Sequence, residues 1–98
     1  MTIDKTQNGK ELLIALTGRL DTTTAPQLDD ELKSALEDIE DLKFDFANLE
    51  YISSAGLRVL LSAQKEMNKK GTMVVKNCSE AVKEIFEVTG FVDILTIE

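Results

Sequence analysis

The chain contains no histidine, no tryptophan and a single cysteine, Cys78. The lack of histidine removes the commonest general base of enzymes and the commonest zinc ligand. One thiol cannot form a disulfide within the chain, and no cation is fixed beside Cys78 to activate it, so we interpret it as a small buried filler. We therefore expect no catalytic residue, no metal site and no cofactor belonging to this chain.

Long apolar runs are absent as well. The longest, Leu12 to Leu16, is far too short to span a bilayer. The segment Met1 to Lys10 is polar and lacks the apolar core of a signal peptide. We therefore expect a cytoplasmic protein.

Positive charge is scarce. The 98 residues carry 11 basic and 18 acidic side chains, a net charge of −7, and no basic cluster exceeds Lys69-Lys70. Nucleic acids and anionic membranes are therefore poor partners. The acidity leaves two interpretations open: it serves solubility alone, or it matches a basic surface on a protein partner.

The sequence does contain a regular alternation of strand and helix patterns, which predicts one α/β domain over residues 1–98. Strands are predicted over Thr2 to Thr6, Glu11 to Thr17, Leu42 to Leu49, Thr72 to Lys76 and Phe91 to Ile97, and helices from Thr24 to Ile39, Leu57 to Met67 and Ser79 to Gly90. The order is ββαβαβα followed by a final short strand. A tight Asn8-Gly9 turn makes the first pair antiparallel, and helical crossovers make the later strands parallel. The expected fold is a mixed β-sheet packed by about three main helices.

Local signals set three of the expected boundaries. Gly18 to Thr24 is predicted as a loop. Thr24 is expected to form a capping box with Gln27, and Pro26 suits the first helical turn, where its missing N–H costs little. Gly71 is the expected terminator of the second helix.

Two adjacent hydroxyls, Ser53 and Ser54, lie where a strand ends and a helix begins. Backbone N–H groups are unpaired at a helix N-terminus and the helix dipole favours negative charge, so a phosphate on one of these hydroxyls would be accepted. The simpler interpretation is that one serine only caps the helix. Gly56, in the first turn, permits another backbone to approach closely, either a partner's loop or the chain's own sheet.

A second polar segment, Arg19 to Thr24, follows the predicted central strand. Loops at the carboxyl ends of parallel strands share one edge of a sheet, so Asp21 and Thr22 are expected to lie near Ser54. Alternatively, Asp21 only caps its own loop.

An enzymatic function is not expected. The Ser-Ser-Ala-Gly segment lacks the glycine that precedes the serine of a nucleophile elbow, and no general base is paired with Ser54. No glycine-rich phosphate-binding loop is present either.

Taken together, the motifs of the chain resemble those of the STAS domain, and specifically the stand-alone anti-sigma factor antagonists of bacteria. The resemblance covers essentially all 98 residues, and it is carried by Leu16-Thr17-Gly18-Arg19-Leu20-Asp21 with Thr24-Ala25, Phe46-Ala47-Asn48-Leu49, Tyr51-Ile52-Ser53-Ser54-Ala55-Gly56-Leu57, Ala81-Val82-Lys83-Glu84-Ile85-Phe86 and Thr89-Gly90-Phe91.

The resemblance implies a partner-switching role. An unphosphorylated antagonist binds an anti-sigma factor that is also a serine kinase, which releases a sigma factor, and phosphorylation at Ser54 ends that binding. ATP and a metal ion then belong to the kinase, and a serine phosphatase is the expected further partner. Family members often have an acidic residue where this chain has Ser53, so Ser53 is the alternative acceptor.

The partner surface implied by the resemblance, together with the predicted edge of the sheet, comprises Asp21, Thr22, Thr23, Ser53, Ser54, Ala55, Gly56 and Arg58. Exposed strand edges permit either a monomer or a weak dimer. One rival function is a constitutive STAS protein-binding subunit of a transport or stress-signalling complex, without a phospho-switch. A nucleotide- or lipid-responsive sensor is a weaker rival, because the chain lacks a phosphate cradle.

Overall fold

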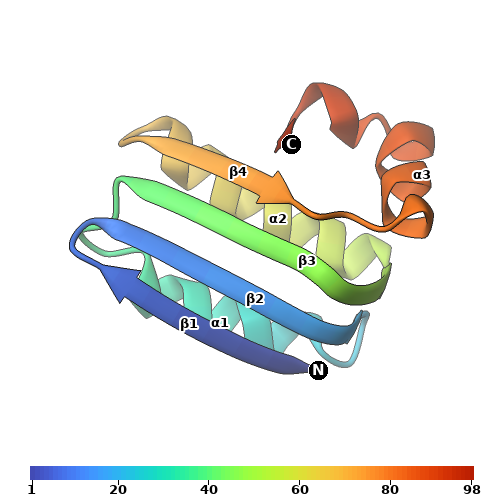
Figure 1. Cartoon of the computed structure of the whole chain (residues 1–98), viewed down its shortest axis with the longest axis horizontal. Coiled ribbons are helices and arrows are strands. Elements are labelled where there is room, and N and C mark those ends of the chain that lie inside the picture. Colours follow the sequence, from blue (N-terminus) through green and yellow to red (C-terminus); the bar gives the residue numbers. More distant parts are fainter.

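Strands and helices follow one another in the predicted order, and the computed structural model describes all residues from 1 to 98 (Figure 1). The elements are β1 (Thr2–Asn8), β2 (Glu11–Leu20), α1 (Ala25–Ala35), β3 (Asp41–Ile52), α2 (Ser54–Asn68), β4 (Thr72–Lys76), α3 (Glu80–Thr89), a short 3-10 helix η1 (Phe91–Asp93) and β5 (Thr96–Ile97). The predicted α/β class and the order ββαβαβα followed by a short strand are confirmed.

The five strands form one mixed sheet in the order β1-β2-β3-β4-β5. β1 runs antiparallel to β2, and the remaining pairs are parallel. The first turn differs from the prediction by one residue: Asn8 pairs with Glu11, so the two loop residues are Gly9 and Lys10. Only Gly9 has a positive φ, of 66°, which suits a turn whose first central residue is glycine.

The core lies on one face of this sheet. Buried apolar residues alternate along β2 and β3 with more exposed ones, as the period-two pattern predicted, and the buried sets are Leu12, Ile14 and Leu16 on β2 and Leu42, Phe44 and Phe46 on β3. Figure 1 shows α1 and α2 behind the sheet, covering that face. Burying a side chain of this size contributes about 1.5–3 kcal/mol, so the pattern fixes which face the helices cover.

The first helix is shorter than predicted. It ends at Ala35 with Leu36 as its C-cap, whereas the apolar pattern continues to Ile39. Asp38 adopts a left-handed conformation with φ 64°, which breaks the helix, yet Ile39 is fully buried in the core. The helical spacing of Ile39 therefore reflects burial and not helix.

The third helix has the predicted ends, but the segment after it does not form one long strand. Ser79 Oγ accepts a hydrogen bond from Val82 N at 3.2 Å, and Gly90 ends the helix with φ 80°. The predicted strand from Phe91 to Ile97 is instead the 3-10 helix η1 followed by the two-residue strand β5. Local i to i+3 bonds, such as Ile94 N to Phe91 O at 3.0 Å, satisfy the backbone there in place of a ladder.

The strands β2 and β3 both extend further than predicted. Gly18 to Leu20 was predicted as the beginning of a loop, but these residues continue β2 and pair with the end of β3. Gly18 has φ 105°, and register shifts on either side of it let the strand bend without ending. The extension matters because it carries the candidate site beyond the body of the sheet.

The predicted role of Gly71 as helix terminator is wrong. α2 ends at Asn68 with Lys69 as its C-cap in a right-handed conformation, and Gly71 does not have the positive φ of a helix-ending glycine. A Cβ at Gly71 would lie 1.8 Å from the backbone oxygen of Glu40. This glycine is therefore required by a close contact between two segments.

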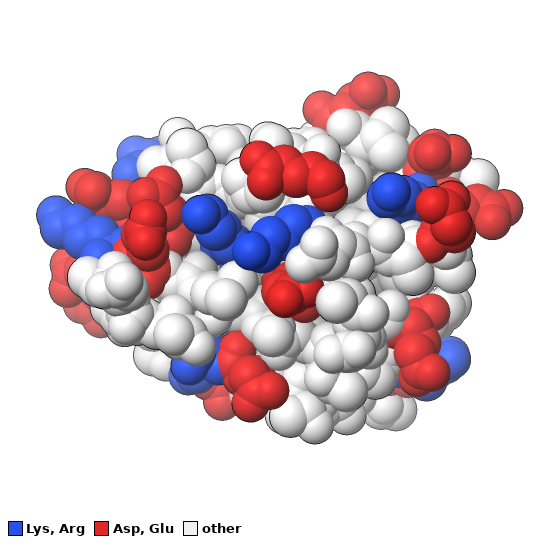
Figure 2. All heavy atoms as spheres, viewed as in Figure 1, with Lys and Arg blue, Asp and Glu red and all other residues white.

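Charges of both signs are interspersed on the surface. Figure 2 shows the sheet face turned away from α1 and α2, where lysine and arginine side chains form only short groups between acidic side chains. No helix of the structure combines the length and the apolar character needed to cross a membrane.

Candidate functional site

The candidate site is the edge of the sheet where β2 and β3 end, and we call residues 19–24 and 51–58 the rim. Leu20 pairs with Ile52 across the two strands, and Ser53 N donates a 2.8 Å hydrogen bond to Leu20 O. Asp21 and Ser53 therefore leave adjacent strand ends. The expected proximity of the Asp21 loop and the two serines is observed.

The two serines have different environments. Ser53 is the N-cap of α2, and its Oγ accepts a hydrogen bond from Gly56 N at 3.3 Å. Ser54 is the first residue of the helix and is exposed, and its hydroxyl makes no hydrogen bond within the chain. The capping role predicted for one of the serines therefore falls to Ser53, which leaves the hydroxyl of Ser54 free.

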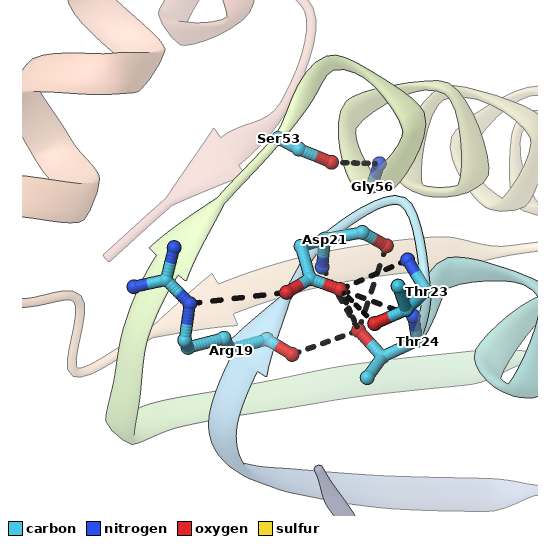
Figure 3. Close-up of polar contacts among 6 residues, drawn as sticks. All are labelled: Arg19, Asp21, Thr23, Thr24, Ser53 and Gly56. Atoms are coloured by element: carbon cyan, nitrogen blue, oxygen red, sulfur yellow. Dashed lines mark hydrogen bonds and ion pairs between the residues drawn. The ribbon is translucent and has the colours of Figure 1, made fainter.

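Asp21 organises the loop before α1. Its Oδ1 accepts hydrogen bonds from Thr23 N at 3.0 Å, Thr23 Oγ1 at 2.7 Å and Thr24 N at 3.2 Å (Figure 3). The alternative interpretation of Asp21, that it caps its own loop, describes this geometry. Its position beside Ser53 also keeps it on the rim.

The predicted capping box of α1 is wrong. Thr24 occupies the N-cap position, but its side chain makes no cap hydrogen bond. Its hydroxyl instead donates to Arg19 O at 2.8 Å and accepts from Asp21 N at 2.8 Å. The threonine ties the end of β2 to the loop, while Pro26 sits in the first helical turn as predicted.

We predict that Asp21 makes the fold sensitive to acid. Hydrogen bonds, first that from Thr23 Oγ1, lower the pKa of the Asp21 carboxyl from its ordinary value of 3.8, although partial desolvation opposes them. A carboxyl with a lowered folded-state pKa stabilises the fold above its unfolded pKa, and that stabilisation is lost as the pH falls through the folded-state pKa. In thermal melts, Asp21→Asn is expected to lower the melting temperature at pH 7, and the difference from the wild type is expected to shrink below pH 3.8.

The control for this prediction is Asp4→Asn, because Asp4 is exposed on β1 and its carboxylate makes no hydrogen bond or ion pair. A difference between Asp21→Asn and the wild type that stays constant from pH 7 down to pH 2 would contradict the prediction. Some acid sensitivity is expected to persist in the variant, since hydrogen bonds from Ala47 N and Asn77 also lower the pKa of Asp45.

A shallow hollow of about 330 Å³ lies between the N-terminal parts of α1 and α2. Thr22, Ala55 and Arg58 line it together with residues of α1. A larger hollow, of about 710 Å³, lies between α1 and α2, but none of the predicted site residues line it. Three of the eight predicted residues therefore line the smaller hollow, and we place the site on the rim beside it.

Gly56 is the exception among the predicted surface residues, because it is buried. A Cβ at this position would lie 2.7 Å from Leu20 Cγ, 3.0 Å from Leu20 O and 3.1 Å from Ile52 Cγ2. The close approach that Gly56 permits is therefore to the chain's own sheet. Its contribution to the rim is to let the start of α2 sit against the ends of β2 and β3.

A profile of the STAS domain family matches residues 2–98. The chain belongs to the STAS domain family. It is 30% identical over 98 residues to the anti-sigma-B factor antagonist of Bacillus subtilis, which covers 99% of this chain and 90% of that protein. It is 34% identical to BtrV, a candidate anti-sigma factor antagonist of Bordetella bronchiseptica, over 99% of this chain and 84% of the relative.

Solved structures share the fold of this STAS domain. An anti-sigma factor antagonist from Mycobacterium paratuberculosis superposes with a TM-score of 0.88 at 21% identity, over 98% of this chain and 83% of the other. The Bacillus protein SpoIIAA in its phosphorylated form superposes with a TM-score of 0.77 at 18% identity, over 99% and 91%. At these identities the likeness concerns the fold alone.

The STAS rim also contains two side chains that the sequence analysis did not select, Arg19 and Tyr51. The guanidinium carbon of Arg19 lies 4.5 Å from the centre of the Tyr51 ring, and Arg19 Nε lies 3.8 Å from Asp21 Oδ2. These residues are cross-strand neighbours in the extended ends of β2 and β3. Extending the two predicted strands would not have paired them, because two register shifts, between Ala15 and Thr17 and between Gly18 and Arg19, set this pairing.

No three His, Cys, Asp or Glu side chains of the STAS domain are grouped so that they could hold a metal ion. Cys78 is buried, and its burial raises the pKa of the thiol.

Proposed function

We propose that this STAS domain is an anti-sigma factor antagonist, which binds an anti-sigma factor through the rim and thereby releases a sigma factor. The proposal is supported by relatives named as antagonists, which align over nearly the whole chain. In this proposal the STAS domain acts as a binding protein in the cytoplasm, and neither nucleic acid nor a membrane is its partner.

The switch in this proposal is phosphorylation of Ser54 by the anti-sigma factor itself. The observation that supports this switch is that the two hydroxyls have different roles. Ser53 caps α2, while Ser54 is exposed at the first helical position and its hydroxyl makes no hydrogen bond within the chain. A kinase can therefore phosphorylate Ser54 without breaking the hydrogen bond by which Ser53 caps α2. Ser53 remains the alternative phosphorylation site, but modification of its hydroxyl would disturb the hydrogen bond that Ser53 Oγ accepts from Gly56 N.

A phosphate at Ser54 would be stabilised within the domain and would weaken binding of the partner. It adds about −1.5 to −2 charges at neutral pH, and the positive end of the helix dipole stabilises such charge. A partner surface shaped for the bare hydroxyl loses its fit and meets an uncompensated charge. ATP and its metal ion belong to the kinase, and a serine phosphatase restores the binding form.

The experiment that tests this function uses the purified chain with each purified anti-sigma factor encoded in the same genome. Each mixture is incubated with Mg²⁺ and ATP, the phosphate is mapped by mass spectrometry, and the complex is measured by size-exclusion chromatography before and after. We expect modification at Ser54, none in Ser54→Ala, and dissociation of the complex. Ser53→Ala is expected to remain a substrate, although the loss of its cap costs about 1 kcal/mol of stability.

Two outcomes would change the proposal. Phosphate on Ser53 in the wild type would move the switch by one residue. A stable complex that ATP leaves intact and unmodified would replace the switch with a constitutive STAS binding subunit.

A further inference from the structure

Both arginines of the chain lie on the rim, at positions 19 and 58, whereas none of the nine lysines falls within residues 19–24 or 51–58. Arg58 lines the hollow beside Ala55, and Arg19 lies over Tyr51 on the strand ends. The rim of a chain with net charge −7 therefore presents arginine as its cation. Arginine differs from lysine in offering a planar fork of donors that matches a carboxylate.

The Arg19 side chain has two contacts on the rim. Its guanidinium stacks over the Tyr51 ring at 4.5 Å, and its Nε faces Asp21 Oδ2 at 3.8 Å. The backbone of Arg19 is held separately, because its carbonyl oxygen accepts a hydrogen bond from Thr24 Oγ1. The other carboxylate oxygen of Asp21 is already occupied by Thr23 and Thr24, so Asp21 cannot rotate away. These two contacts restrict the Arg19 side chain before any partner arrives, which reduces the entropy lost on binding.

The guanidinium of Arg19 nevertheless keeps its hydrogen-bonding capacity. The 3.8 Å separation from Asp21 is too long for a hydrogen bond, and the side chain makes none elsewhere in the chain. Figure 3 shows the two terminal nitrogens of Arg19 directed away from Asp21. The Arg19 side chain is 58% exposed, so a carboxylate of another molecule can reach its two terminal nitrogens.

We propose that Arg19, positioned by Tyr51 and Asp21, is a specificity-determining contact that binds an aspartate or glutamate carboxylate of the anti-sigma factor. The inference rests on the proposed function, since it names the chemistry of that partner at one point of the rim. The acidic remainder of the chain repels other acidic surfaces, so on the rim a carboxylate is accepted only beside an arginine. Arg19 is the rim arginine that Tyr51 and Asp21 position.

The test measures the dissociation constant for the anti-sigma factor that the wild type binds, by isothermal titration calorimetry at low and moderate salt. Arg19→Glu is expected to weaken binding by about 100-fold or more, because it removes a charge-assisted pair and adds a like charge. Arg19→Lys retains the charge without the fork and is expected to weaken binding by about tenfold. Lys69→Glu is the control, since Lys69 is exposed at the other end of α2 and the charge change is the same.

A charge swap identifies the partner group. Each exposed carboxylate of the anti-sigma factor is replaced with lysine in turn, and one replacement is expected to restore at least tenfold of the affinity that Arg19→Glu loses. Arg19→Gln serves as the binding variant if circular dichroism shows that Arg19→Glu does not fold. A merely structural role of Arg19 would not give partner-specific rescue.

The experiment distinguishes failure of the proposed function from failure of the inference about Arg19. A wild type that binds no anti-sigma factor overturns the proposed function and this inference with it. A wild type that binds, with folded Arg19→Glu and Arg19→Gln within about threefold of Lys69→Glu, overturns this inference alone.

Discussion

Replacing Gly71 with alanine is expected to cost about 3 kcal/mol of folding stability, because the new methyl group overlaps backbone. Its carbon would lie 1.8 Å from Glu40 O and 2.6 Å from the Glu40 carbonyl carbon. Neither atom belongs to a flexible side chain that could move aside. Thr72 N also donates a 2.9 Å hydrogen bond to Glu40 O, so separating the segments breaks a bond between the starts of β3 and β4.

The measurement is a pair of thermal and urea melts, in which a loss of about 3 kcal/mol corresponds to a fall of roughly 12–24 °C in a domain of this size. Gly9→Ala is the matched control. Its Cβ would meet nothing within 4 Å, so only the strain of its positive φ remains, about 1–2 kcal/mol. If Gly71→Ala destabilises the fold less than Gly9→Ala does, the close contact with Glu40 is not what requires the glycine.

Gly71 illustrates which parts of this fold the sequence could predict. The order of elements followed from apolar periodicity, and the cap at Ser79 and the end at Gly90 followed from local rules that need only a few neighbouring residues. A glycine after a helix fits the local rule for helix ends equally well. The reason that applies here lies in Glu40, 31 residues earlier in the chain, and no local pattern contains it.

The same distinction separates the two predicted caps on either side of the rim. Ser53 had no competitor for the first N–H groups of α2, and it caps the helix as the local rule states. Thr24 had Asp21 three residues earlier, whose carboxylate binds Thr24 N and whose own N–H takes the threonine hydroxyl. The capping box did not form because Asp21 occupies both groups that Gln27 would need, Thr24 N and the Thr24 hydroxyl.

The candidate site was predicted to the extent that it depends on topology. Parallel strands end at a shared edge, and this placed Asp21 and Thr22 beside the serines. Arg19 and Tyr51 required the register of β2 on β3, which the shifts around Gly18 alter. A residue with positive φ and two irregularities of pairing cannot be derived from alternation alone, so the stacking of Arg19 on Tyr51 appears only in the structure.

Replacing Ser54 with aspartate is also expected to have a large effect on binding. This variant is expected to bind the anti-sigma factor at least about 100-fold more weakly than the wild type, which corresponds to about 2.8 kcal/mol. In the proposed complex, the new carboxylate stands where the partner would meet a bare hydroxyl, and it also offers an internal competitor for the rim arginines. Stability is expected to be unchanged or slightly higher, by about 0.3–1 kcal/mol, because an acid suits the first turn of a helix.

Titration calorimetry and thermal melts on the same samples separate binding from folding. Ser54→Ala is expected to bind like the wild type, since the hydroxyl of Ser54 makes no hydrogen bond that the fold would lose. Ser34→Asp adds the same charge to an exposed serine near the other end of α1, and it is expected to change the affinity by less than about threefold, as screened surface charges do. Equal affinities for Ser54→Asp and Ser34→Asp would mean that charge at the start of α2 does not control the complex. In that case the free hydroxyl of Ser54 is not the switch, and the rim is a constitutive binding surface.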